Sequence, residues 1–188
     1  SITNQVNNQY FQYKAFLEPE NITYLSELRS VNIVSGTSAA PVVMTGTLND
    51  SAYTSTFAFT GNNMSGNTTI PASSGYNHLT VNNASETYVL AGHTTASGNV
   101  TITAGTLDAT ATNYNLTVGG NFDNNGTFTA RSGTVTMNAG SAGKTFECGS
   151  SSLYDLTFNN ASGGWTMQTD NCVVTHNLTL TAGAWVLA

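Results

Sequence analysis

The sequence predicts an all-β fold, a parallel β-helix (β-solenoid) with an N-terminal cap or arm. Three observations support this prediction: a long internal repeat, strand-like segments that return at short intervals, and a composition rich in Thr, Asn, Ser and Gly. Helical periodicity is almost absent. An antiparallel β-sandwich is the alternative fold, because short alternating strands also occur there.

The internal repeat has an offset of about 77 residues and is present about twice. Leu79–Ser85 (LTVNNAS) returns as Leu156–Ser162 (LTFNNAS), and Asn99–Gly105 (NVTITAG) returns as Asn177–Gly183 (NLTLTAG). Two segments that keep their order at nearly one offset indicate a structural repeat. Hairpins of an antiparallel sheet would not need so long a period, so the repeat favours the solenoid.

A shorter rhythm lies within this repeat. In each short segment apolar side chains alternate with threonine, which is typical of a half-buried strand. Coils of about 20 residues, each with short strands and tight turns, predict a β-helix over residues 41–188 in which each coil covers the last. The segments follow one another at uneven steps and begin at Leu79, Val100, Leu116, Val135, Leu156 and Leu178.

Residues 1–40 differ from the rest of the chain. The Pro-Glu pair at Pro19, followed by apolar residues on one side, favours a short helix. Three roles remain open for this region: a cap that closes the end of the solenoid, an arm that adds a strand to a neighbouring subunit, or an unrelated linker. The candidate assembly contacts of such an arm are the aromatic residues Tyr10, Phe11, Tyr13 and Phe16.

The other end of the sequence is an apolar strand. Trp185, Val186 and Leu187 have no polar segment after them, and an uncapped solenoid end exposes core side chains and unpaired backbone groups. We therefore expect this strand either to contact a second copy or to be covered by further coils of a longer chain. A head-to-tail contact that does not close produces a filament.

Charged residues make up only 7% of the sequence, against roughly 25% in ordinary soluble proteins. The net charge is -6 and the only cations are Lys14, Arg29, Arg131 and Lys144, so no nucleic-acid partner is expected. No apolar run reaches the length of a transmembrane helix, so no membrane span is expected either. A surface with little charge repulsion tolerates close contact with copies of itself.

The two cysteines, Cys148 and Cys172, lie roughly one coil apart in the sequence. Neighbouring coils of a solenoid would therefore bring them together. A disulfide is expected if the chain is secreted, and two buried free thiols remain the alternative. The absence of Met at Ser1 fits either a trimmed chain or a mature product after signal cleavage.

Asn-x-Ser/Thr sequons are frequent, and in a secreted chain they are candidate N-glycosylation sites. A chain rich in Asn and Thr also produces sequons by chance, and Asn at the start of a strand can serve a turn. The ten candidates are Asn21, Asn49, Asn63, Asn67, Asn83, Asn99, Asn115, Asn125, Asn160 and Asn177.

No catalytic constellation stands out in the sequence. The three histidines lack metal-ligand spacing, and there is no zinc pattern or phosphate-binding loop. The segment Asp123-Asn124-Asn125-Gly126 is interpreted as a tight turn rather than a weak calcium site. We therefore expect no enzymatic activity, no cofactor and no metal.

Three segments carry a family resemblance: Gly126–Met137, Leu153–Ser162 and Asn177–Gly183. They resemble the β-strand-repeat surface proteins, which are large β-helical, adhesin-like proteins of bacteria and archaea. The resemblance covers roughly residues 76–188. It implies a β-helix located at the cell surface, and it implies no catalytic residues.

These observations predict an extracellular structural subunit that binds copies of itself head to tail. The product would be a surface filament, a pilus-like fibre or a sheath. The alternative is an adhesin stalk or a glycan-binding fragment of a longer surface protein, whose partners would be surface glycans.

Overall fold

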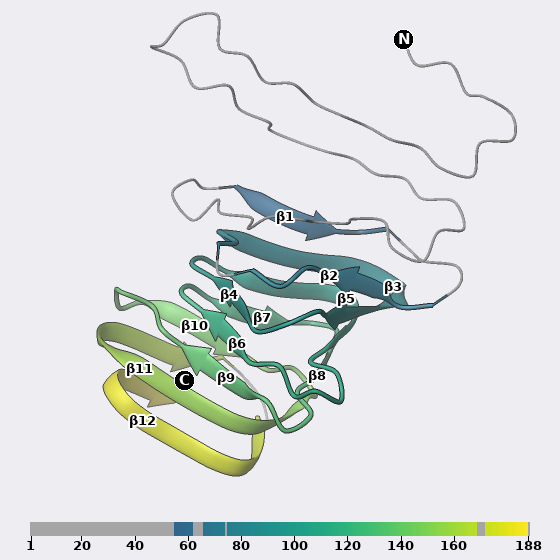
Figure 1. Cartoon of the computed structure of the whole chain (residues 1–188). Coiled ribbons are helices and arrows are strands. Elements are labelled where there is room, and N and C mark those ends of the chain that lie inside the picture. Colours follow the sequence, from purple (N-terminus) through teal and green to yellow (C-terminus); the bar gives the residue numbers. More distant parts are fainter. Residues whose placement is uncertain (1–54, 62–65, 74, 169–171, 188) are drawn as a thin grey trace, which may run out of the picture. The chain divides into compact units, whose positions relative to one another are not determined.

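The computed structural model describes residues 55–61, 66–73, 75–168 and 172–187, and these residues form strands and turns without any helix (Figure 1). All pairs between the described strands are parallel. This confirms the parallel β-solenoid, with about six turns, and excludes the antiparallel sandwich. The predicted N-terminal helix and the boundary at residue 41 lie outside the described residues. Within the described part no helix is present that is long and apolar enough to cross a membrane.

The twelve strands of the described residues belong to one continuous sheet. They are β1 (Thr56–Phe59), β2 (Thr68–Ile70), β3 (His78–Leu90), β4 (Thr94–Ala96), β5 (Val100–Asp108), β6 (Leu116–Val118), β7 (Phe122–Asn124), β8 (Thr127–Thr129), β9 (Thr134–Met137), β10 (Lys144–Glu147), β11 (Ser152–Met167) and β12 (Val173–Leu187).

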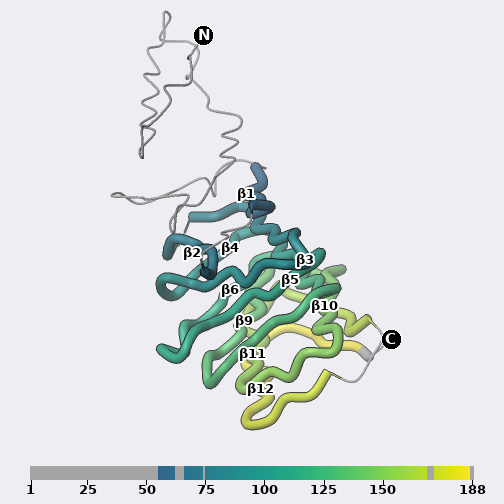
Figure 2. The backbone as a smooth tube through the Cα atoms, turned by 90° about the vertical axis from the view of Figure 1, so that its right-hand side faces the viewer, coloured from purple at the N-terminus to yellow at the C-terminus, as the bar shows by residue number. Residues whose placement is uncertain are grey.

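The strands form three columns, which we call faces X, Y and Z. Face X contains β1, β7, β10, the first parts of β3 and β5, and the last parts of β11 and β12. Face Y contains β2, β8 and the second parts of β3 and β5. Face Z contains β4, β6, β9 and the middle parts of β11 and β12. Figure 2 shows the coils following one another from β1 to β12.

The two copies of the sequence repeat lie on different faces. Leu79 pairs with Val100 on face X, whereas Leu156 pairs with Leu178 on face Z. The offset of the repeat is therefore not a whole number of coils. What repeats is a strand, a corner and the strand after it, and the solenoid uses this unit at two different corners.

The short step between Val100 and Leu116 does not measure a coil. It leads from face X to face Z within the same coil, because Val100 pairs with Phe122 and Leu116 pairs with Val135. The six threonine-containing segments thus form two columns rather than one. Partners on adjacent coils give the true coil length, which is longer from Val100 to Phe122 than from Leu116 to Val135.

The core consists of the alternate side chains that point into the coils. Aromatic rings pack against one another in part of the core: Phe122 stacks on Phe146 at 5.5 Å, and Phe158 lies 5.9 Å from Phe146, edge to face, and 5.1 Å from Trp165 between ring centroids. The other side chains of each strand point outward, where β-branched threonine suits an exposed strand. On face Z the outward positions that pair from coil to coil are Thr95, Thr117, Thr136, Thr157 and Thr179.

Candidate assembly surface

The two repeat copies build the same corner. Gly105 has a φ of 86° and Gly183 a φ of 97°, in the left-handed region that favours glycine. In the coil before each glycine, the side-chain oxygens of Asn83 and Asn160 each accept the N–H of the residue two positions later, at 3.1 Å. The local sequence therefore determines the same turn at two places in the solenoid.

The two corners differ in what covers them. On the first copy, β7 pairs with β5, and Val100 and Ile102 are 1% and 0% exposed. On the second copy, the equivalent Leu178 and Leu180 are 49% and 53% exposed. Within the described residues β12 pairs with β11 alone, so no strand covers its other edge. We call residues 177–187 of β12 the open coil surface.

The sequence located part of this surface. Trp185 is half-buried and stacks on Phe158 with 5.7 Å between ring centroids, whereas Val186 is exposed. Leu187 pairs with Met167 in the last register position of β12. Nothing in the described residues tests the predicted contacts of these three residues with another copy.

Leu178 and Leu180 are the functional candidates that sequence reasoning missed. Their alternation with threonine predicts buried core positions, as found for Val100 and Ile102. No sequence signal distinguishes these two leucines, because the same alternation occurs in the covered copy of the repeat.

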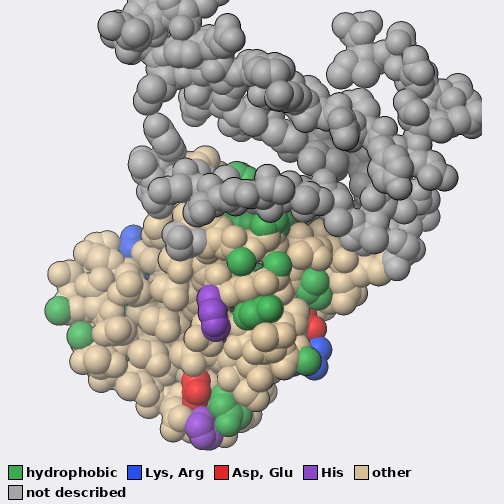
Figure 3. All heavy atoms as spheres, in the orientation of Figure 1, with side chains coloured by type: hydrophobic (Ala, Val, Ile, Leu, Met, Phe, Trp, Pro, Cys, Tyr) green, Lys and Arg blue, Asp and Glu red, His purple; other side chains and the backbone are tan. Residues whose placement is uncertain are grey.

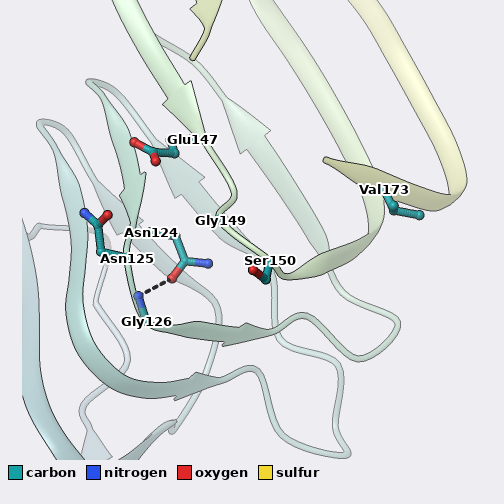
Figure 4. A pocket seen from close by; sticks show the side chains of 7 residues that line it. All are labelled: Asn124, Asn125, Gly126, Glu147, Gly149, Ser150 and Val173. Carbon is teal, nitrogen blue, oxygen red and sulfur yellow. Dashed lines mark hydrogen bonds between the residues drawn. The ribbon is translucent and has the colours of Figure 1, made fainter. Parts of the chain in front are cut away.

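The coil that covers the first copy is fixed by a buried asparagine. Asn124 donates from Nδ2 to the Cys148 carbonyl oxygen at 2.8 Å and to Ser151 Oγ at 3.0 Å. Its Oδ1 accepts the N–H of Gly126 at 3.2 Å, as Figure 4 shows. The segment expected to be a tight turn is thus a corner whose central side chain is buried and fully hydrogen-bonded.

A shallow hollow of about 610 Å³ lies beside this corner. Asn125 and Glu147 line it from the inner coils, and Val173 lies on its far side, on β12 (Figure 4). Among the described residues that line it, Glu147 is the one ionisable side chain. Within the described part of the chain, no three His, Cys, Asp or Glu side chains are close enough together to hold a metal ion.

Side-chain acceptors cap the strand that starts on the next coil. Asn99 Oδ1 accepts the N–H of Asn121 at 2.9 Å, and Asn121 Oδ1 accepts the N–H of Thr145 at 3.0 Å. Asn177 is the counterpart of Asn99 in the repeat. Among the described residues no N–H donates to Asn177 Oδ1, because no coil follows it there.

An ion pair joins two covered coils. Arg131 Nε and Nη2 donate to Asp108 Oδ1 and Oδ2 at 2.9 and 2.7 Å. The Arg131 guanidinium holds the pKa of the Asp108 carboxyl below its usual range, and the N–H of Thr110 adds to this effect. Arg131 adopts a φ of 55°, so the pair forms from a turn residue in the left-handed region.

A disulfide joins Cys148 to Cys172, with 5.7 Å between their Cα atoms. It links the chain just before β11 to the chain just before β12, so it attaches the last coil covalently to the one beneath it. Of the two possibilities open in the sequence, the structure contains the disulfide. No free cysteine occurs among the described residues.

The described sequons fall into two groups. Asn67, Asn115, Asn125 and Asn177 are exposed, whereas Asn83, Asn99 and Asn160 are half-buried. The oxygens of the half-buried group form the turns and caps described above, which gives these asparagines a structural role. Nothing in the structure tests glycosylation. Seven of the predicted glycosylation and assembly residues lie outside the described part of the chain: Asn21, Asn49, Asn63, Tyr10, Phe11, Tyr13 and Phe16.

Face Z has few charged side chains. Figure 3 shows it as mostly polar and uncharged, with two histidines that each lie beside a hydrophobic side chain. His176 stacks on Tyr154 with 4.4 Å between ring centroids, and its Nδ1 lies 2.8 Å from Asp155 Oδ1. The pKa of Asp155 is lowered by this contact with His176. An aromatic pair next to a carboxylate and a threonine column combines a flat apolar surface with hydrogen-bonding groups.

Comparisons with known proteins add no family to these observations. No family model matches the chain, and neither the curated proteins nor the solved structures contain a match to it. The class that the fold defines is therefore the parallel β-solenoid, and function must be argued from the surfaces of the chain itself.

Proposed function

We propose that the protein is a non-catalytic, extracellular structural subunit that assembles end to end into a surface filament or sheath. The observation that carries this proposal is the open coil surface. Leu178 and Leu180 occupy core positions of the solenoid, yet they are half exposed, while their counterparts Val100 and Ile102 are buried under the next coil. A second copy would bury them in the same way.

Burial of Leu178 and Leu180 alone does not supply enough free energy for two copies to associate. Full burial of a leucine contributes about 1.5–3 kcal/mol, so covering two that are already half-buried adds roughly 1.5–3 kcal/mol in total. Association costs about 4–15 kcal/mol in lost freedom. The remainder must come from backbone pairing along β12 and from the rest of the coil, so we expect assembly to depend on concentration.

Two further features support the proposal. The low charge leaves little repulsion between copies. The disulfide between Cys148 and Cys172 fits an oxidising, extracellular compartment, and it holds the last coil in place as a docking surface. An N-terminal arm bearing Tyr10, Phe11, Tyr13 and Phe16 would add contacts between subunits.

Electron microscopy and sedimentation of the full chain at rising concentration test this function. We expect filaments whose axial repeat is one subunit, and we expect Leu180→Asp to abolish them because it places a charge in the contact. Thr136→Asp is the matched control, since Thr136 points outward from a covered coil and should leave assembly intact. Single short rods at every concentration would overturn the proposal.

The second candidate is a glycan-binding stalk, favoured by face Z. The stacked Tyr154 and His176 offer an apolar face to a sugar ring, and Asp155 and the threonine column offer hydrogen bonds. Affinity electrophoresis in gels that contain neutral polysaccharides tests this function. Retardation that is lost in Tyr154→Ala and kept in Tyr114→Ala would support it, and unchanged migration in every gel would reject it.

A further inference from the structure

We propose that the coil containing β1 of a second copy covers β12, with Phe57 over Leu178, Phe59 over Leu180 and Gly61 at the Gly183 corner. This inference rests on the proposed function and deepens it, because it names both surfaces of the contact and their register. Figure 2 shows β1 and β12 as the first and last strands of the described stack.

The covered copy of the repeat shows what the open copy accepts. On β5, Phe122 pairs with Val100 and Asn124 pairs with Ile102. Gly126 then lies over the corner at Gly105, where a Cβ on Gly126 would be only 2.6 Å from the Gly105 carbonyl oxygen. The covering coil therefore needs an aromatic residue, a second inward residue two positions later, and glycine two positions after that.

The first described coil has this spacing. Phe57, Phe59 and Gly61 match Phe122, Asn124 and Gly126 position by position. None of the strands β3, β5 and β10 on face X matches in full, since the glycine position is Asn83, Ala104 and Ser150 respectively.

Within the described residues of one copy, no neighbouring atom explains why Gly61 is glycine. A Cβ added to it would meet no atom within 4 Å, in contrast to Gly126. A contact with β12 gives this glycine the same role that Gly126 has over Gly105. Within the described residues β1 pairs with β3 alone, so the side of β1 that would meet β12 carries no described strand.

The side-chain acceptor that caps the start of the covering strand is also present in both copies of the repeat. Asn99 Oδ1 accepts the N–H of Asn121, the residue before Phe122. In the proposed contact Asn177 Oδ1 accepts the N–H of Thr56, the residue before Phe57. The segments 56–61 and 177–183 contain no charged side chain, so they can pair without repulsion or the burial of an ion.

The proposed register determines how each subunit is rotated relative to the next. β1 belongs to face X, and residues 177–180 belong to face Z, so each joint turns the next subunit by one face of the solenoid. Simple continuation of the columns would instead place β1 over residues 185–187 on face X. The two registers pair different outward residues: Ala58 meets Thr179 in the first and Val186 in the second.

Cysteine cross-linking separates these registers. Ala58→Cys is mixed with Thr179→Cys, with Val186→Cys or with Thr136→Cys, and each mixture receives a short bismaleimide without reductant, so the native disulfide is retained. All four positions point outward, and each variant is first checked for filaments by electron microscopy. We expect several-fold more cross-linked dimer from the 58–179 mixture than from the other two.

The outcomes distinguish a wrong register from a wrong function. Dominant 58–186 dimer, or filaments without cross-linking at 58–179, overturns the register and leaves end-to-end assembly standing. A monomeric wild-type protein at all concentrations overturns the proposed function itself, and the register with it.

Discussion

The strand–corner–strand unit at β3–β5 and its counterpart at β11–β12 share two similar seven-residue segments and the same corner geometry, but they have different surroundings. Each has an asparagine that caps its turn and a glycine with positive φ in the next coil. The first unit is buried beneath β7 and β8, whereas the second has only the coil below it. The comparison teaches that short-range sequence determines the corner, while the neighbouring coil determines how much each apolar residue stabilises the fold.

Truncation of the paired core positions should give the largest difference between the two units. Ile102→Ala leaves a cavity between covered coils, and we expect it to lower the free energy of unfolding by about 2–5 kcal/mol. Leu180→Ala removes a half-exposed side chain, and its cost to the dilute protein should be less than half as large. Urea denaturation at low concentration measures both values, and equal losses would contradict the picture of an open last coil.

The coil that covers the first copy of the repeat can be destabilised by removing its buried asparagine. Asn124→Ala leaves the Cys148 carbonyl and Ser151 Oγ without their donor in a buried site, so we expect a loss of about 1–3 kcal/mol. Asn125→Ala is the matched control, because Asn125 is exposed and its Nδ2 bonds only to Asp123 among the described residues. Thermal melts of both variants test this prediction, which fails if the two melting temperatures fall equally.

The smallest predicted effect on stability is that of low pH on the ion pair between Asp108 and Arg131. The pKa of Asp108 is lowered in the folded protein by Arg131, so the folded state holds this proton less tightly than the unfolded state. The ion pair therefore stabilises the fold above the ordinary pKa of aspartate, and its contribution is lost as the pH falls through the lowered value. Asp108→Asn should flatten this part of the stability–pH profile. An unchanged profile would show that the pair does not couple folding to pH.

Several parts of the fold could be predicted because they depend on neighbours in sequence. The alternation of apolar residues with threonine at Leu116, Val135 and Leu156 predicts strands, and these strands are found. The corner at Asn125 and Gly126, directly after β7, depends on the same kind of local signal. The assignment of strands to faces could not be predicted, since segments starting at Val100 and Leu116 look alike but belong to different columns.

The candidate assembly surface was predicted only in part, because the exposure of its residues depends on the neighbouring coils. Trp185 and Val186 attract attention because of their place in the sequence, which needs no structure. Leu178 and Leu180 have the sequence pattern of buried residues, and they are exposed because no described coil covers them. Likewise, the ion pair of Asp108 with Arg131 joins residues 23 positions apart, and no pattern links them.

The sequence by itself determined that this chain forms strands, that its strands turn at Gly and Asn, and that its coils must stack to bury their apolar sides. These properties follow from side-chain alternation and from backbone conformations that few residues other than glycine adopt. The tertiary structure alone decided which strands share a face, how Asp108 meets Arg131, and which copy of the repeat is covered by a further described strand. The physical reason is that burial and strand pairing depend on residues a full coil away, at distances set by corners of variable length.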